Sequence, residues 1–65
     1  MPSSVIRGFE YDPDAHRLAV TFVSGKSYAY LGVPEGVAAN FSRAFSKGEY
    51  FNAAIRDLYP FEKLR

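Results

Sequence analysis

The side chains of this sequence that could do chemistry are few, and they form no recognisable catalytic set. The chain has no cysteine and one histidine, His16, with Asp12 and Asp14 nearby. A metal site needs more ligands of better type, and a nucleophilic mechanism needs a nucleophile within reach of a base. We therefore expect no catalytic residue, no metal site and no cofactor, and we interpret Asp12 and Asp14 as turn residues.

Basic side chains offer a second kind of chemistry, the binding of phosphate. Arg43, Lys47 and Arg56 fall around the junction of two predicted helices and could form one local patch. Acidic residues are interleaved with basic ones along the chain, and the formal net charge is only +1. A nucleic-acid binder usually gathers its basic residues on one face. The sequence thus leaves open both an ordinary solvated surface and a small RNA-binding patch.

Tyr28, Tyr30 and Asn52 could contact a ligand directly. The two tyrosines share one face of a strand, where they could stack bases or pack in the core with their hydroxyls at the rim. The other face of that strand carries the small residues Ser27 and Ala29, so we expect the tyrosines to face the core. Asn52 could bind a ligand near a helix start, although local bonding at the helix corner is the simpler interpretation.

Three predicted strands position these residues. They are residues 5–11, 17–23 and 27–31. In the first, Ile6 is out of phase with Phe9, which predicts a bulge near Arg7 and Gly8. In the second, strict alternation predicts a buried face formed by Leu18, Val20 and Phe22. Gly25 suits a tight hairpin turn, and short connections favour an antiparallel meander.

Two helices are predicted after the strands. Pro34 suits the first turn of one, and Ser46 with Glu49 forms a capping box that opens the other, which Pro60 ends near Tyr59. Apolar residues recur at helical spacing: Val37, Phe41, Ala44 and Phe45, then Phe51, Ala54, Ile55 and Leu58. A small sheet needs a cover on one face. The predicted fold class is α+β, a three-stranded antiparallel β-meander followed by two α-helices packed on one sheet face.

The length of 65 residues allows one domain, residues 1–65. We expect an ordered core at about residues 3–59 and a short tail at 60–65 that frays or folds back. Without disulfide or metal, stability must come from packing of six phenylalanines and five tyrosines. The chain start lacks a signal-peptide pattern and no apolar run could span a membrane. The expectation is a small soluble cytoplasmic domain that does not bind membranes.

A series of short motifs runs through the chain in order. They are Ser3-Ser4-x-Ile6, Tyr11-Asp12, Leu18-x-Val20-x-Phe22, Gly25, Tyr28-Ala29-Tyr30, Val33-Pro34, Ser46-x-Gly48, Phe51-Asn52, Ile55 and Tyr59. At these spacings the chain resembles the KTSC domain, a short module named for its occurrence at the C-terminus of some lysyl-tRNA synthetases. The chain departs from the family pattern at Ala38, where an aromatic residue is common.

The resemblance implies the fold described above and a bacterial, stand-alone form of the domain. Through the synthetase connection it implies RNA, tRNA in particular, as a partner. We therefore expect a small non-catalytic binding module for RNA; the alternative is a protein-interaction module or homodimer, favoured by the aromatic content. No nucleophile–base pair, carboxylate pair or phosphate loop indicates an enzyme. The candidate nucleic-acid-binding residues are Arg43, Lys47, Arg56, Tyr28, Tyr30 and Asn52.

Overall fold

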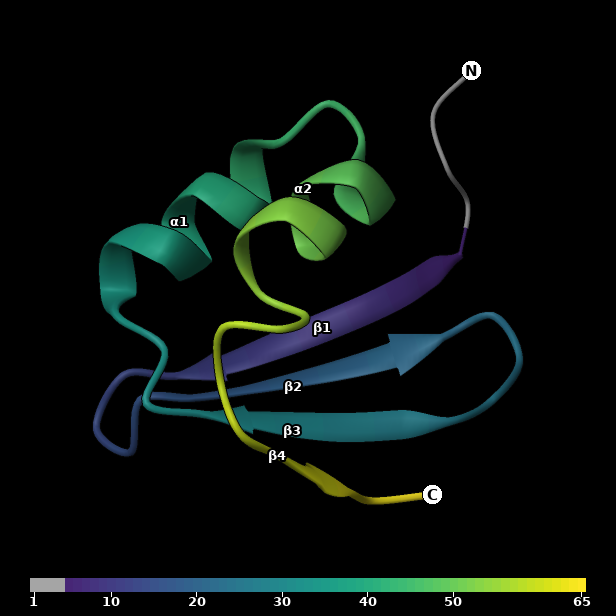
Figure 1. The fold of residues 1–65 in the computed structure, drawn as a ribbon, viewed down its shortest axis with the longest axis horizontal. Coiled ribbons are helices and arrows are strands. Elements are labelled where there is room, and N and C mark those ends of the chain that lie inside the picture. Colours follow the sequence, from purple (N-terminus) through teal and green to yellow (C-terminus); the bar gives the residue numbers. More distant parts are fainter. Residues whose placement is uncertain (1–4) are drawn as a thin grey trace.

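The protein forms an antiparallel sheet that is covered on one face by two helices (Figure 1). The structure, a computed structural model, describes residues 5–65. Its elements are β1 (Ile6–Asp12), β2 (Arg17–Phe22), β3 (Ser27–Leu31), α1 (Glu35–Arg43), α2 (Lys47–Ala54) and β4 (Phe61–Lys63). The strands lie in sequence order across a sheet of four strands. The predicted α+β class is confirmed, whereas the prediction of three strands is wrong because β4 adds a fourth.

A bulge in β1 brings its apolar residues into phase with the core. The pairing register shifts between Ile6 and Gly8, so that Ile6 opposes Phe22 and Phe9 opposes Val20. An extra residue on one strand restores the facing of the residues that follow it. Ile6 and Phe9 therefore both pack against the core cluster, as the sequence predicted.

Local hydrogen bonds and positive φ angles form the turns between the strands. Asp12 Oδ1 accepts a hydrogen bond from the Asp14 amide at 3.0 Å, which confirms Asp12 as a turn residue. His16 has a positive φ of 52°, and its carbonyl accepts from the Val33 amide at 2.9 Å. Gly25 has the positive φ of 94° that the hairpin between β2 and β3 requires. The lone histidine thus has a structural place in the β1–β2 turn.

Both helices begin where the sequence predicted. Pro34 precedes α1, and its carbonyl accepts a hydrogen bond from the Ala38 amide. Ser46 caps α2, because its hydroxyl accepts from the Glu49 amide at 3.2 Å. The capping prediction at Ser46 is confirmed.

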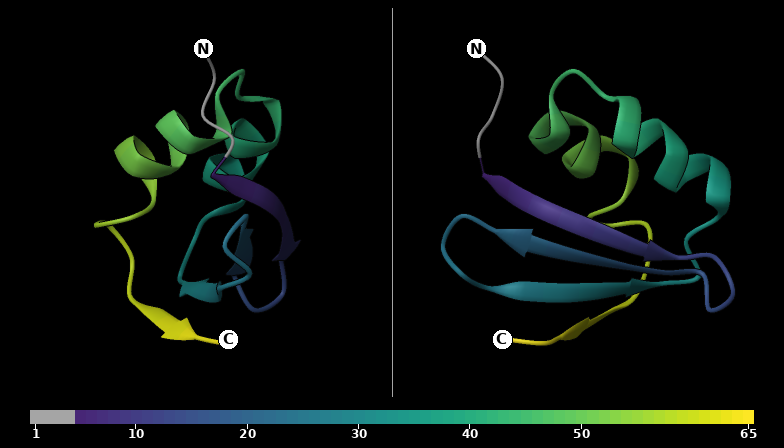
Figure 2. Two further views of the ribbon diagram at one scale, coloured as in Figure 1. Left: turned by 90° about the vertical axis from the view of Figure 1, so that its right-hand side faces the viewer. Right: turned by 180° about the vertical axis from the view of Figure 1, so that it is seen from behind.

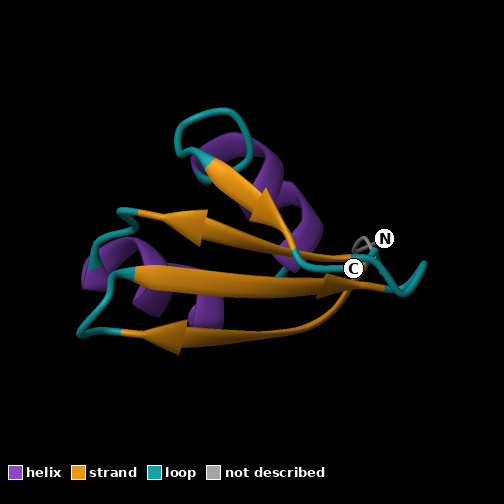
Figure 3. Ribbon diagram, turned by 90° about the horizontal axis from the view of Figure 1, so that it is seen from below, coloured by secondary structure: helices purple, strands orange, loops and turns teal. Residues whose placement is uncertain are grey.

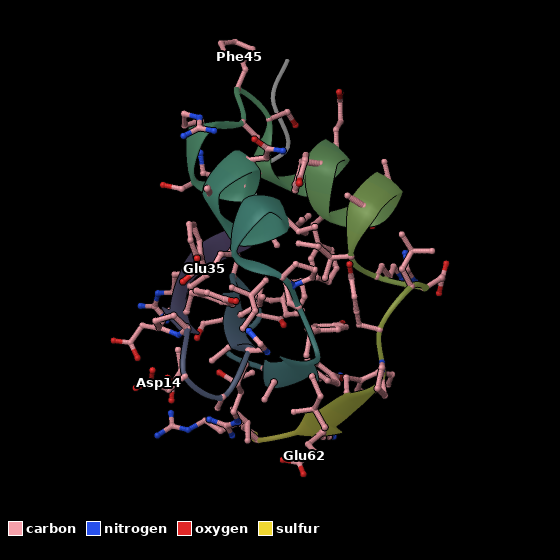
Figure 4. All side chains as sticks on the ribbon, turned by 90° about the vertical axis from the view of Figure 1, so that its left-hand side faces the viewer. Asp14, Glu35, Phe45 and Glu62 are labelled. Atoms are coloured by element: carbon pink, nitrogen blue, oxygen red, sulfur yellow. The ribbon has the colours of Figure 1, made fainter. Side chains whose placement is uncertain are left out.

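Both helices end earlier than predicted, and this corrects two members of the apolar stripes. The backbone leaves the helical conformation at Ala44 and Ile55. The helical periodicity stops there, so Phe45 is 89% exposed and Leu58 is 64% exposed. Figure 4 shows Phe45 projecting from the helical layer, away from the sheet.

The core lies between the sheet and the helices. Its largest fully buried side chains are Phe41, Leu18, Ile55, Val20 and Val33. Phe22, which the sequence assigned to the central core, is only partly buried and packs against the edge of the cluster. Its position at the end of β2, beside the turn to β3, leaves one side of the ring open.

β4 forms from the segment after α2, which leaves the helical layer and descends to the far edge of the sheet (Figure 2). Its residues pair with β3, with Phe61 opposite Tyr30 and Lys63 opposite Tyr28. The Leu31 amide donates to the Pro60 carbonyl at 2.9 Å and extends this pairing. Three residues are too few to show a strand periodicity, so the sequence pattern did not reveal β4.

The second face of the sheet has no helix over it in the part of the chain that the structure describes (Figure 3). Across its middle run Glu10, Ala19, Ala29 and Glu62, one from each strand. Thr21 and Ser27 share a hydrogen bond between their hydroxyls at 3.2 Å. The small side chains predicted for this face offer no ring on which a base could stack.

Candidate functional site

A groove of about 700 Å³ opens between α2, the β2–β3 turn and β4. Its most prominent lining is aromatic. The rings are Phe22, Tyr28, Tyr30, Phe51 and Phe61. They come from β2, β3, α2 and β4, so four elements that are distant in sequence build the groove.

The aromatic rings form a floor and a rim. Tyr30 and Phe51, 5% and 3% exposed, form the floor, with ring centroids 5.3 Å apart and nearly perpendicular. Phe22 and Tyr28 are partly buried and lie edge to face, 5.8 Å apart. Phe61 is 55% exposed and lies 5.4 Å from Tyr28. The rings pack edge to face, which is a favoured arrangement for aromatic pairs. Part of the rim therefore stays accessible.

The hydroxyls of Tyr28 and Tyr30 reach solvent. Neither has a hydrogen-bond partner among residues 5–65, and no buried polar side-chain atom in that range lacks one. Burial raises the pKa of Tyr30 above its ordinary value of 10.0, Tyr28 and Asp57 raise this pKa further, and Arg56 opposes the rise. The Tyr30 hydroxyl is therefore a protonated donor at neutral pH, within the electrostatic reach of Arg56 and Asp57.

Polar side chains stand on two walls of the groove. Asn52 lies on α2, and Arg56 and Asp57 lie in the turns that follow it. The Arg56 Nη1 donates to Asn52 Oδ1 at 3.4 Å, which leaves other guanidinium hydrogens and the Asn52 amide hydrogens available. Lys26 lines the groove from the β2–β3 turn. The groove can stack a planar group, bind an anion, and both donate and accept hydrogen bonds.

The structure divides the six candidate residues into two groups. Tyr28, Tyr30, Asn52 and Arg56 line the one groove. Arg43 and Lys47 do not line it. The Arg43 Nη2 donates to Asn40 Oδ1 at 3.1 Å on α1, and the Lys47 Nζ donates to the Ala44 carbonyl at 2.7 Å at the α1–α2 junction. Of the three basic candidates, Arg56 alone lines the groove.

Several residues of the groove lining were not singled out from the sequence as site residues. Among them are Phe22, Lys26, Asp57 and Phe61. Phe22 carried a core signal, and Lys26 and Asp57 carried only charge. Phe61 depends on β4, which no sequence pattern revealed. A site assembled from distant segments leaves no local motif, so the sequence indicated only part of the lining, namely Tyr28, Tyr30, Asn52 and Arg56.

The described part of the chain holds neither a cluster of metal-binding side chains nor a membrane-spanning helix. Within residues 5–65 there is no group of three or more histidine, cysteine or acidic side chains that could hold a metal ion. No helix in that range is long and apolar enough to cross a bilayer.

Comparison with known proteins relates this arrangement to a family. The sequence profile of the KTSC domain matches residues 2–59. The crystal structure of a KTSC domain protein from Yersinia pestis superposes with a TM-score of 0.90 at 37% identity, covering 100% of this chain and 94% of that one.

Curated relatives include both long and short proteins. A lysine–tRNA ligase of Nostoc punctiforme is 39% identical over 61 residues, which are 94% of this chain but 11% of the ligase. This chain therefore spans about a tenth of the ligase's length. An uncharacterised protein of Stutzerimonas stutzeri is 38% identical over 56 residues, covering 86% of this chain and 79% of that protein. The resemblance found in the sequence motifs is confirmed, and this chain belongs to the KTSC domain family.

Proposed function

We propose that the domain is a non-catalytic RNA-binding module whose groove takes unpaired nucleotides. One observation carries the proposal: the accessible rings of Phe22, Tyr28 and Phe61 lie in the same groove as Lys26 and Arg56. Aromatic rings stack exposed bases, and basic side chains bind the phosphates between them. A groove with both features fits a single strand better than it fits a purely apolar ligand.

The charge distribution favours unpaired RNA over a duplex. Proteins that bind double-stranded RNA contact phosphates and 2′-hydroxyls over a broad surface. Here the net charge is +1, and Arg43 and Lys47 lie outside the groove. Two basic side chains beside three accessible rings suit a few splayed nucleotides.

The relatives suggest which RNA to test first. The Nostoc relatives are lysine–tRNA ligases by name. A segment similar to this chain is therefore part of proteins that are named for tRNA. The occurrence of two domains in one protein is an association and shows no mechanism. It makes tRNA, with its unpaired loops and ends, the first candidate.

The proposal includes no catalytic step. Among the described residues that line the groove there is no histidine, and His16 lies in the β1–β2 turn. Ser24 lines the groove but a serine nucleophile needs an adjacent base. The groove has the features of a binding surface.

The experiment is a fluorescence anisotropy titration with labelled bulk tRNA and an unstructured single-stranded RNA, at low and physiological salt. Phe61→Ala is compared with Phe45→Ala, an exposed phenylalanine outside the groove, and Arg56→Ala with Arg43→Ala. We expect Phe61→Ala to weaken binding roughly 5- to 100-fold, the loss of one stacked base. Arg56→Ala should weaken binding and reduce its salt dependence.

The two control variants should bind as the unchanged protein does. Absence of RNA binding at low salt would contradict the proposal. Equal losses for Phe45→Ala and Phe61→Ala would move the site away from the groove.

A second candidate function is binding to another protein or to a second copy of the chain. The observation that favours it is Phe45, 89% exposed between the two helices. Sedimentation velocity of the protein and of Phe45→Ala over a range of concentrations tests it. A concentration-dependent dimer that Phe45→Ala abolishes would favour this candidate, and a monomer at every concentration would exclude self-association.

A further inference from the structure

Asp57 is the one groove residue that an RNA-binding function leaves unexplained. Its carboxylate lines a groove that we assign to a polyanion, where it repels phosphate. Among residues 5–65 it has no hydrogen-bond partner, since the neighbouring Arg56 donates to Asn52 instead. An exposed carboxylate with both oxygens available is suited to accept hydrogen bonds from a ligand.

The chemistry of a carboxylate limits which base it can recognise. It accepts hydrogen bonds and donates none when ionised, and its two oxygens take a pair of parallel donors. Guanine presents two adjacent donors, N1–H and N2–H, on its Watson–Crick edge. Adenine and cytosine present an amino group beside a ring nitrogen that repels the carboxylate. Uracil presents one N–H between two carbonyls.

We propose that the groove selects guanine among unpaired nucleotides, with the Asp57 carboxylate accepting from guanine N1–H and N2–H. The inference rests on the proposed function. Phe61 and Tyr28 supply the rings against which the base stacks. Asn52 and Arg56, on the same wall as Asp57, retain donors for guanine O6 and for phosphate.

The arrangement of charges around Asp57 supports this assignment. Arg56 is adjacent in sequence and lines the same groove, so its positive charge offsets the repulsion between the carboxylate and the RNA backbone. Tyr30, Arg56 and Asp57 all line this groove, so both charges lie in the same cleft as the aromatic rings. An acceptor flanked by donors is the pattern needed to read one base edge.

The test is a set of short, otherwise identical uridine-rich RNAs that differ in one central base: guanine, inosine, adenine or cytosine. Inosine lacks the 2-amino group and so loses one of the two donors. We expect guanine to bind roughly 5- to 100-fold more tightly than adenine or cytosine, with inosine between them. Binding is measured by anisotropy at one fixed salt concentration.

Asp57→Asn is the decisive variant, because an amide retains the size and offers one acceptor oxygen in place of two. It should abolish the guanine preference, because binding of the guanine RNA weakens toward that of the adenine RNA. Asp14→Asn is the matched control, an exposed aspartate in the β1–β2 turn, at the opposite end of β2 from the groove (Figure 4). It should keep the full preference.

The outcomes separate the two proposals. Equal binding of all four RNAs, with Phe61→Ala still weakening each, would overturn the guanine assignment and leave RNA binding intact. A guanine preference that survives Asp57→Asn would also overturn it. Failure to bind any of the RNAs would remove both proposals together.

Discussion

The part of the sheet beneath α1 and the part beside α2 and β4 use tyrosine in opposite ways. On the first, which we call the closed side, Tyr11 Oη donates to the Val33 carbonyl at 2.6 Å. There Tyr50 also reaches across from α2, and its Oη donates to the Val37 carbonyl of α1 at 3.0 Å. On the second, the groove side, the hydroxyls of Tyr28 and Tyr30 have no partner among residues 5–65.

The phenylalanines repeat the contrast. On the closed side Phe41 is fully buried, with its ring 4.4 Å from Phe9 and 5.8 Å from the stacked ring of Tyr50. On the groove side Phe61 stays 55% exposed. Accessible aromatic rings with hydroxyls free to bond are typical of binding surfaces, whereas buried and bonded ones hold a fold. Composition alone does not separate these roles; position relative to the helices does.

The largest expected effect is on the closed side. Phe41→Ala removes a fully buried ring at the centre of the core and should lower the free energy of unfolding by about 3–5 kcal/mol. So small a domain has little stability to lose, so the variant should be largely unfolded in thermal melts followed by circular dichroism. Phe61→Ala is the control and should melt within a few degrees of the unchanged protein. Similar melting of both variants would break the comparison.

The sequence predicted the bulge in β1 and the cap of α2 well because the signals for both are local. The bulge in β1 followed from the phase of Ile6 and Phe9, and the cap of α2 followed from Ser46 and Glu49. Both features are confirmed. Each depends on residues a few positions apart, which a sequence pattern records directly.

The groove side was predicted poorly because it depends on contacts between distant segments. β4 is three residues long and exists through its pairing with β3. Outside the groove, Phe45 and Leu58 were also misplaced, because they matched the helical spacing but the helices stop before them. Hydrophobic periodicity cannot show where backbone geometry ends a helix. The wall formed by Phe61 and the placement of Asp57 in the same groove as Tyr28 and Tyr30 emerged only from the tertiary arrangement.

A smaller loss of stability should distinguish removal of the Tyr11 hydroxyl from removal of the Tyr28 hydroxyl. Tyr11→Phe removes the donor that satisfies the Val33 carbonyl and should lower the free energy of unfolding by about 1–2 kcal/mol, because a shielded acceptor is left unpaired. Tyr28→Phe removes a hydroxyl that has no partner among residues 5–65 and should change stability by less than about 0.5 kcal/mol. Urea denaturation of both variants measures the difference. A larger loss for Tyr28→Phe would place a buried hydrogen bond on the groove side.

The smallest expected effect is a loss of folding stability at alkaline pH, and it concerns Tyr11 on the closed side and Tyr30 on the groove side. Burial is the main cause that raises the pKa of both Tyr11 and Tyr30 above 10.0. Above about pH 10 the folded protein retains the phenol protons that the unfolded chain loses. The contribution of the two tyrosines to the free energy of unfolding is therefore complete below about pH 10 and is lost as pH rises through their folded pKa values. The melting temperature should therefore fall above about pH 10, and Tyr11→Phe and Tyr30→Phe should each reduce the fall.

Arg56 distinguishes the two tyrosines. Its charge lowers the pKa of Tyr30 and is not among the causes that act on Tyr11. Arg56→Ala should therefore raise the pKa of Tyr30 further and enlarge the alkaline loss of stability, while Arg43→Ala, its control outside the groove, should not. In a Tyr30→Phe background Arg56→Ala should lose this effect. If the enlargement persists there, Arg56 acts on a group other than Tyr30, and the proposed influence of the Arg56 charge on the Tyr30 pKa is wrong.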